Sequence, residues 1–484
     1  MAKTENKQNL GLVIVIAAVA STGGLLFGFD TGVISGALPF LKEHWALDSN
    51  QMEWITTAAL IGAVLGAASS GRITDIFGRK KVILVTSVIF AAGSILTGAA
   101  TSPAFLAASR IILGIAIGIS SFTVPLYISE ISPTKMRGAL VSSFQLMITI
   151  GILVSYFSDL HFADESNPES WRWMFYVGVF PAIILFVGML FLPETPRYLI
   201  GSGKEEQGRK ILSKLEDPTL ADESVNKIKA EIARDKESGT DWKEIFSPWL
   251  RTSLIIAIGI MFVQQFVGIN TIIYYAPTVF IIAGFSGAKA AITATITVGV
   301  VNVLSTILSM FLIDKIGRRK LYFIGLTGMG VSLAALGTFF LLKDTLGPSL
   351  KYITVASILI YIFFFAISLG PLGWLIISEI FPLKLRGLGM SIGSLSNWLF
   401  NAIVAFTFLK LAWLFTADGM EIVKEGATAA EADPNPAGAF FLYSIVAVLG
   451  IFWGLKYIPE TKGVSLEDIE AHWRAGKAPN ELGK

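Results

Sequence analysis

Two charged side chains lie deep within apolar stretches of this 484-residue sequence. Asp30 falls in the first long apolar run, which begins near Leu10, and Arg110 falls in a run that begins near Pro103. If these runs cross a bilayer, each charge costs at least about 2.5 kcal/mol unless it has a partner or a function. We expect Asp30 and Arg110 to pair. Such a pair can serve as a carboxylate that binds and releases a proton, or as a permanent structural ion pair.

A second set of polar side chains interrupts the apolar runs, most of them in the second half of the chain. Amides both donate and accept hydrogen bonds, and aromatic rings cover C–H surfaces, so together they suit a neutral ligand that is rich in hydroxyls. Each amide alone could equally serve to form a hydrogen bond between helices. The candidate ligand-binding residues are Phe27, Gln145, Gln264, Gln265, Asn270, Asn302, Trp374, Asn397, Trp398 and Asn401.

Two further places in the apolar runs could bend or close over such a site. Gly370 and Pro371 should break their helix, because proline removes a backbone hydrogen bond and glycine lowers helix stability. Tyr274 and Tyr275 lie where another helix could bend. All four are gate candidates; the alternative for Tyr275 is an ordinary packed aromatic.

The composition sets the class of protein. The chain is 53% hydrophobic and only 15% charged, which is typical of a protein that crosses a membrane several times. A net charge of +2 gives no case for a nucleic-acid partner. No cysteine is present, and the three histidines, His44, His161 and His472, lie among polar residues, so we predict no metal site, no cofactor and no catalytic cluster.

Twelve apolar runs are long enough, at about 20 residues each, to span a bilayer as helices. They divide the chain into a first six-helix bundle (1–192), a charged helical linker (193–250), a second six-helix bundle (251–463) and a tail (464–484). The twelve runs are 11–38, 54–72, 82–101, 104–128, 139–159, 174–192, 252–278, 290–313, 321–342, 352–378, 388–409 and 438–456.

Basic residues in the short loops predict that both termini are cytoplasmic. The alternate loops are poor in lysine and arginine: 39–53 has only Lys42, and 410–437 is mainly acidic. The basic residues are Arg72, Arg79, Lys80 and Lys81 after the second run, Lys135 and Arg137 after the fourth, Lys315, Arg318, Arg319 and Lys320 after the eighth, and Lys384 and Arg386 after the tenth.

The two halves of the chain repeat one another. The segment 129–138 (SEISPTKMRG) returns as 378–387 (SEIFPLKLRG), and 75–80 (DIFGRK) returns as 314–319 (DKIGRR). A Pro-Glu-Thr sequence closes each half, at 193–195 and 459–461. Parallel six-helix repeats are typical of secondary transporters with a binding site between the bundles, near the middle of the membrane.

At these motifs the sequence resembles the sugar-porter branch of the major facilitator superfamily, over essentially its whole length. The loop 71–81 (GRITDIFGRKK) is similar to the superfamily's loop motif, and 193–197 (PETPR) and 459–463 (PETKG) are similar to signatures of this branch. The second copy of the loop departs, with Met310 where the first has Gly71. The resemblance implies an all-α membrane protein with the major facilitator fold.

The resemblance also implies a function. Gln145, Gln264, Gln265, Asn270, Asn302 and Trp374 match the family's sugar-contacting positions, and the proton-coupled symporters of the branch have an aspartate at the position of Asp30, where passive glucose facilitators have asparagine. Asn397-Trp398 resembles the glucose-facilitator pair, so we expect a hexose such as glucose or galactose, with xylose left open. The alternatives are a sugar uniporter, a polyol or inositol symporter, and a sugar receptor that does not transport.

Charged residues at the cytoplasmic ends of the helices suggest a further network. Setting the topology accounts for the lysines and arginines, but glutamates contribute little to topology. We expect ion pairs between the two bundles that hold the inner side shut, as the family's inner charge network implies. Its members are Asp75, Arg79, Glu130, Arg137, Glu194, Asp314, Arg318, Glu379, Arg386 and Glu460. We therefore predict a monomer in the cell (inner) membrane, with a monosaccharide and a proton as its partners.

Overall fold

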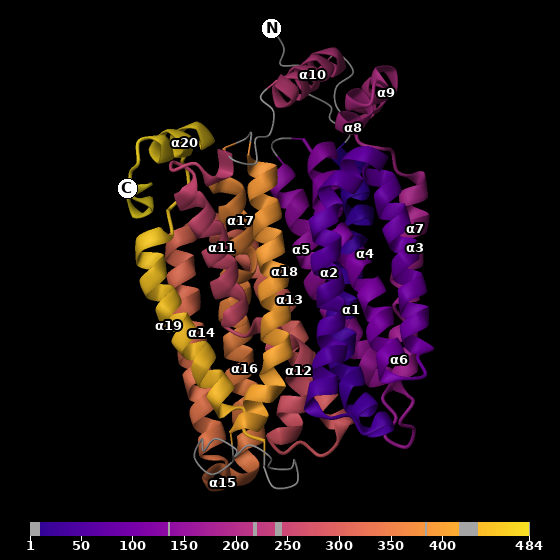
Figure 1. The fold of residues 1–484 in the computed structure, drawn as a ribbon, viewed down its shortest axis with the longest axis vertical. Helices are drawn as coiled ribbons and strands as arrows, with labels where there is room; N and C mark the ends of the chain where they lie inside the picture. Colours follow the sequence, from indigo (N-terminus) through magenta and orange to yellow (C-terminus); the bar gives the residue numbers. More distant parts are fainter. Residues whose placement is uncertain are drawn as a thin grey trace.

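A computed structural model shows that the elements of the described residues are helices, twelve of which are long and apolar enough to cross a membrane. Figure 1 shows them side by side along one axis. The structure describes residues 10–133, 136–215, 220–237, 244–382, 385–415 and 434–483. Lys135, Lys384 and most of the loop 410–437, which entered the prediction of topology, lie outside these ranges.

Six membrane-spanning helices form in each half of the chain, as the sequence predicted. The first half holds α1 (Leu10–Trp45), α2 (Ser49–Phe77), α3 (Arg79–Gly98), α4 (Pro103–Ile131), α5 (Arg137–Phe162), and α6 (Trp171–Tyr176) continued by α7 (Val179–Phe191). The second half holds α11 (Arg251–Phe266) continued by α12 (Ile269–Ile282), α13 (Ala288–Ile316), α14 (Arg318–Leu341), α15 (Lys343–Leu346), α16 (Leu350–Ile367) continued by α17 (Leu369–Ile380), α18 (Arg386–Leu414) and α19 (Ala437–Tyr457). The linker forms α8 (Pro196–Gly201), α9 (Glu205–Leu215) and α10 (Ala221–Glu237), and the tail forms α20 (Leu466–Arg474).

The helices begin and end where local chemistry requires. Asp48 caps α2 in a reciprocal capping box with Gln51, and Ser102 caps α4 just before Pro103. Gly78 separates α2 from α3 at φ +90°, and Gly317 separates α13 from α14 at φ +96°. These backbone angles favour glycine, so the repeated loop motif makes the same tight turn in both halves.

Glycines let α1 pack closely against α5. Gly24, Gly28, Gly32 and Gly36 recur every four residues on α1, and a Cβ atom at any of them would collide with α5. At Gly28, for example, it would lie 1.9 Å from the backbone oxygen of Ile148. Small residues on one helix face allow this approach in membranes, where packing and hydrogen bonds drive helix association.

Two of the membrane-spanning helices are interrupted at mid-length. The seventh breaks at Gly268, whose φ is +87°, between α11 and α12. The tenth breaks at Ser368, so that Gly370 and Pro371 fall in the first turn of α17, where a missing N–H costs little. The predicted break near Gly370 is confirmed. The apolar run 252–278, which we expected to form one helix, is likewise interrupted, because Gly268 adopts a left-handed backbone conformation that favours glycine.

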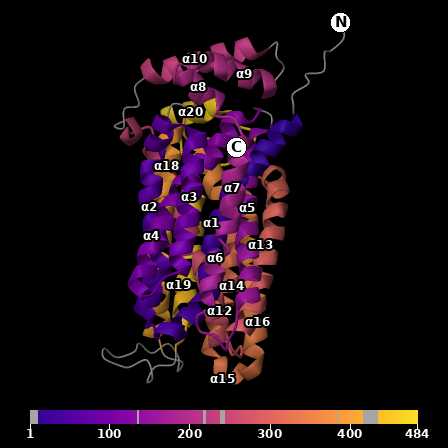
Figure 2. The ribbon, with the colours of Figure 1, turned by 90° about the vertical axis from the view of Figure 1, so that its right-hand side faces the viewer.

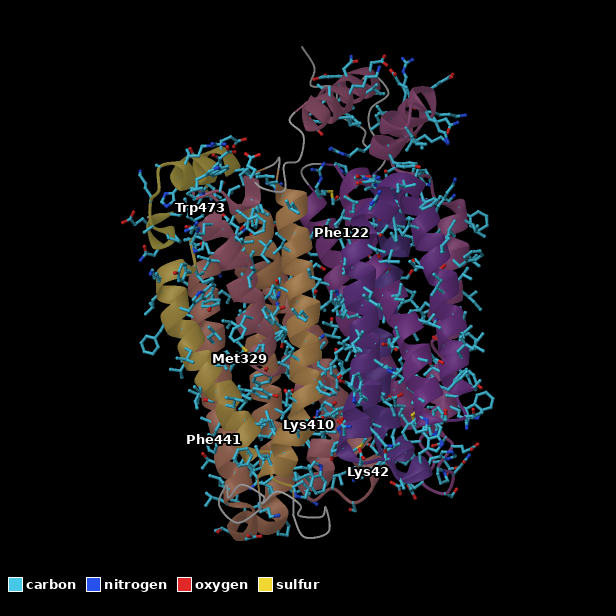
Figure 3. All side chains as sticks on the ribbon, in the orientation of Figure 1. Lys42, Phe122, Met329, Lys410, Phe441 and Trp473 are labelled. Carbon is cyan, nitrogen blue, oxygen red and sulfur yellow. The ribbon has the colours of Figure 1, made fainter. Side chains whose placement is uncertain are left out.

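We name the two ends of the molecule by what they carry. The terminal end is where α1 begins and where α8–α10 and α20 lie; the distal end is opposite (Figures 1 and 2). In Figure 3, Trp473 marks the terminal end, and Lys42 and Lys410 lie toward the distal end. The halves meet through α2 against α18, α5 against α13 and α1 against α12.

Candidate functional site

Asp30 and Arg110 meet in the distal half of the first bundle, as predicted. Their Oδ1 and Nη1 atoms are 3.4 Å apart, and both side chains are buried, at 4% and 2% exposure. Arg110 also donates from Nε to the backbone oxygen of Ile55 on α2, and it lies over the ring of Phe175. The guanidinium is thus held by contacts with α1, α2 and α6.

Two more acids, which were not predicted to lie within the spans, are buried. Asp159 near the end of α5 and Glu53 near the start of α2 are both 0% exposed. Each lies at or just beyond the edge of its predicted apolar run, and the helices extend further than those runs. The expectation that only Asp30 and Arg110 are charged within the spans was therefore wrong.

The amides of the second bundle form one hydrogen-bonded network around the break before α17. Gln264 donates from Nε2 to the backbone oxygen of Leu369 at 2.6 Å, and its Oε1 accepts from Asn397 at 2.6 Å and from Gln265 at 3.3 Å. Asn270 donates to Oε1 of Gln265 at 2.6 Å. Gln264 is the centre of the network, and the broken helices position its partners.

Other predicted ligand-binding residues surround this network. The rings of Phe27 on α1 and Trp398 on α18 lie 5.0 Å apart between their centroids, so an aromatic contact joins the two bundles. Gln145 on α5 and Trp374 on α17 are half-buried, and Asn302 on α13 is buried. Neither Gln145 nor Asn302 forms a hydrogen bond with another residue that the structure describes, which leaves their amides available.

Tyr274 on α12 contacts one of the predicted amides. Its hydroxyl accepts a hydrogen bond from Nδ2 of Asn401 at 3.1 Å. The other amide atom of Asn401, Oδ1, is buried without a hydrogen-bond partner in the described structure.

The distal end of the site is closed. Every residue of α1 from Gly28 to Leu38 and of α12 from Thr271 to Pro277 is buried, whereas Phe27, Gln145, Asn270 and Trp374 are half-buried. Tyr275 is fully buried, donates to the backbone oxygen of Ala405 and packs on Phe408, so it is a packed aromatic in this conformation.

Polar contacts between the bundles also hold the distal end. Glu53 of α2 accepts from the backbone N–H of Lys410 of α18 at 2.9 Å, and its other oxygen is 3.4 Å from the lysine Nζ. Glu165 accepts from the backbone N–H of Lys289 at the start of α13. These contacts must break for the distal end to open.

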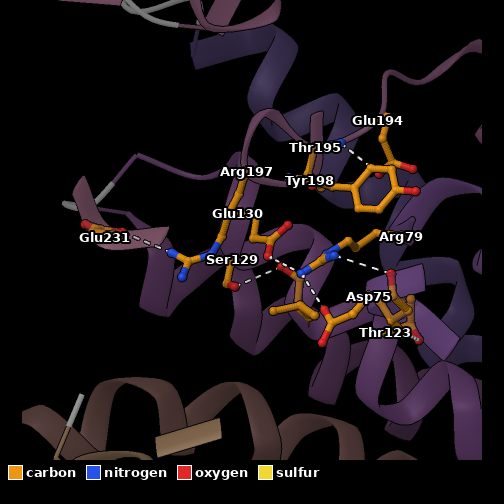
Figure 4. Close-up of polar contacts among 12 residues, drawn as sticks. Asp75, Arg79, Thr123, Ser129, Glu130, Glu194, Thr195, Arg197, Tyr198 and Glu231 are labelled. Atoms are coloured by element: carbon orange, nitrogen blue, oxygen red, sulfur yellow. Dashed lines mark hydrogen bonds and ion pairs between the residues drawn. The ribbon is translucent and has the colours of Figure 1, made fainter. Parts of the chain in front are cut away.

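The charge clusters at the terminal end are built within each bundle. Figure 4 shows Arg79 between Glu130 and Asp75, at 3.0 and 3.3 Å. In the second half, Arg318 contacts Glu379 at 2.9 Å and Asp314 at 3.2 Å. The expected pairs between bundles are absent among the described residues, and Arg137 and Arg386 form no ion pair there. In this conformation the described parts of the bundles do not meet through these charges, so pairing between the bundles when the inner side is shut stays a prediction.

The repeated Pro-Glu-Thr motif has a structural role at the same end. Glu194 accepts hydrogen bonds from the backbone N–H groups of Lys80 and Thr195, and Glu460 accepts from those of Arg318 and Arg319. Each carboxylate therefore satisfies N–H groups at the first turn of α3 or α14. Burial raises the pKa of the Glu194 carboxyl above its ordinary value, against the effect of the N–H groups that it accepts from.

Replacing either capping glutamate should destabilise the protein. Glu194→Ala and Glu460→Ala each leave first-turn N–H groups without an acceptor, and we expect a loss of about 0.5–2 kcal/mol per variant. Thermal unfolding in detergent measures it. Glu231→Ala is the matched control: its half-exposed pair with Arg197 should be worth little. Equal loss in all three variants would contradict the capping role.

Comparisons with known proteins agree on one family. A family model described as "Sugar (and other) transporter" matches residues 16–473. The chain is 36% identical over 483 residues to the galactose-proton symporter of Escherichia coli (strain K12), covering 100% of this chain and 99% of that protein. It is 40% identical over 474 residues to the D-xylose transporter of Levilactobacillus brevis, covering 97% of each. The structure of the xylose transporter XylE from E. coli, in a partially occluded inward open conformation, superposes with a TM-score of 0.77 at 30% identity, over 94% of this chain and 100% of that one.

Proposed function

This chain belongs to the sugar transporter family, and from that premise we propose that it carries a monosaccharide together with a proton by alternating access. It is a multi-pass membrane protein and a transporter, not an enzyme. The observation that carries the proposal is the buried Asp30–Arg110 pair. Tyr274 and Asn401, which hydrogen-bond to each other, would link this pair to the amide network. A passive carrier would not need a carboxylate there, and the galactose relative is a proton symporter.

The amide network and the Phe27–Trp398 contact support the sugar site. Sugar hydroxyls can replace the internal partners of Gln264, Gln265, Asn270 and Asn397, since each amide can donate and accept. We propose that Gln145, Asn302, Trp374 and Asn401 complete this site. A hexose is the first candidate, because Asn397-Trp398 resembles the glucose-facilitator pair.

The proposed cycle follows from the positions of Asp30 and of the amide network. We place the terminal end, with both termini, in the cytoplasm, which fits the basic loops. A proton on Asp30 and a sugar on the amides enter from outside, the distal contacts form, and both leave toward the terminal end. Tyr274, Tyr275, Gly370 and Pro371 would gate these steps, while the ten terminal-end charges would hold the inner side in the opposite state.

The domain division remains a proposal as well. Residues 1–192 and 251–463 would move as two bundles, with 193–250 and 464–484 at the cytoplasmic face. We propose a monomer, because each chain carries a complete site between its own bundles.

Sugar uptake in proteoliposomes with an imposed pH gradient tests the function. Labelled glucose should accumulate when the outside is acidic, and uptake should alkalinise the outside. Competition by unlabelled glucose, galactose, xylose and inositol ranks the substrates. Equilibration without accumulation or alkalinisation would show a uniporter, and binding without uptake would show a receptor.

A further inference from the structure

Asp159 is a buried acid that the proposed cycle does not use. It lies in the last turns of α5 and is 0% exposed. The glycine face of α1 brings it into the bundle: a Cβ atom at Gly36 would lie 2.4 Å from its Oδ2. Gly36 follows Asp30 by six residues, so Asp159 sits about 9 Å closer to the distal end than Asp30 does, at the helical rise of 1.5 Å per residue.

No group in the described structure neutralises this carboxyl. Neither oxygen has a hydrogen-bond partner, and the backbone of Gly36 lies near it without forming a geometrically acceptable hydrogen bond. An ionised carboxylate in this position would be both desolvated and unpaired, which buried groups avoid by becoming neutral. A proton on Asp159 would remove that cost in the distally closed conformation.

The charged and titratable groups around it leave this conclusion unchanged. Tyr156, one turn back on α5, donates its hydroxyl to the backbone oxygen of Ile273 on α12. Asp30 is already paired with Arg110. None of the remaining titratable groups nearby forms an ion pair or hydrogen bond with Asp159 among the described residues. These groups are His161 on α5, Lys42, Glu43 and His44 on α1, Asp164, Glu165 and Glu169 in the loop after α5, Arg172 and Tyr176 on α6, Tyr274 and Tyr275 on α12, and Lys289 on α13.

Asp159 also lies beside a contact that must break. The hydrogen bond from Tyr156 to Ile273 joins the first bundle to the second at the same level of the membrane. Opening the distal end would separate these groups and let water reach the end of α5. The carboxyl would then exchange a proton with the outside.

We propose that Asp159 is a second protonation site, which must bind a proton from outside before the distal end can close. Its carboxylate takes one proton from external water on closing and returns it to external water on opening. It carries no proton across the membrane, so the coupling ratio set by Asp30 is unchanged. This inference rests on the proposed function only in requiring that the chain exchanges sugar.

Sugar exchange at varied external pH tests the proposal. The measurement uses right-side-out vesicles of the Asp30→Asn protein, in which Asp30 no longer titrates, loaded with glucose and given labelled glucose outside. Exchange should fall as external pH rises, by up to about tenfold per pH unit above the midpoint of one carboxyl group. Adding Asp159→Asn, which stays neutral, should abolish this fall. An unchanged pH profile would overturn the proposal.

Controls separate this result from other failures. Ser155 lies one turn back on α5, and its hydroxyl faces Gly32. Ser155→Ala should leave the pH profile as it was. Asp159→Ser gives a second neutral variant in case the asparagine variant does not assemble; a retained alkaline fall in it would also overturn the proposal. Absence of exchange at every pH in the unmodified protein would refute the proposed function instead.

Discussion

Asp30→Asn should abolish accumulation of sugar against its gradient while sugar still exchanges across the membrane. The substitution keeps the size of the side chain but removes the acid that pairs with Arg110. Asparagine cannot bind or release a proton near neutral pH, so the proton gradient no longer biases the cycle. The bundles and the amide network remain, so the alternation of access with bound sugar remains.

The accumulation ratio of labelled sugar measures this effect. The unmodified protein should concentrate sugar when the outside is acidic, and Asp30→Asn should give a ratio of about one, as expected for a carrier without coupling. Asp159→Asn is a matched control, since it neutralises another buried acid at the contact of α1 with α5 and should still accumulate sugar. If Asp30→Asn concentrates sugar, Asp30 is a structural partner of Arg110 and the proton travels elsewhere.

Gln264→Ala should cause the largest loss of sugar affinity. Gln264 is the centre of the amide network, with hydrogen bonds to Leu369, Gln265 and Asn397. Alanine would remove one sugar contact and leave the sugar hydroxyl at that position without its partner, at about 1–3 kcal/mol. A loss of about 2 kcal/mol corresponds to a fall in transport efficiency of about 30-fold.

Initial rates of exchange over a range of sugar concentrations test this prediction. KM should rise, and thermal stability in detergent should be recorded to separate binding from folding. Ser253 lies on the same helix as Gln264, far from the network, and donates a buried hydrogen bond to the backbone oxygen of Ile380. Ser253→Ala removes this bond and should leave KM unchanged. A KM for Gln264→Ala within about threefold of the unmodified value would mean that the amides only join helices, as buried amides can.

The sequence determined the membrane fold and the chemistry of the site. Twelve apolar runs can only become helices in a bilayer, because each backbone N–H must be satisfied within its own segment. The isolated charges of Asp30 and Arg110 predicted an ion pair, because an unpaired charge within the membrane is costly. The repeated motifs located matching loops, and the structure shows Gly78 and Gly317 making the same turn.

The burial of Asp159 and Glu53 could not be predicted, because each lies at the edge of its apolar run. Asp159 and Glu53 look like loop or boundary residues, since hydropathy falls where polar residues begin. Their burial depends on which neighbour each meets: Gly36 gives Asp159 its place, and α18 covers Glu53. Those contacts join residues about 120 and 360 positions apart, beyond any local pattern.

Only the tertiary structure decided how the polar groups are connected. The sequence supplied the amides, but Gly268 and Ser368 break two helices and turn Gln264 toward Leu369. It supplied the terminal-end charges, but Arg79 and Arg318 find their acids within their own bundles. A residue type fixes what a side chain can bind, whereas the packing of distant helices fixes which partner it reaches and whether water reaches it. For the same reason Asp30 could be predicted from its type and position, but Asp159 required the three-dimensional structure.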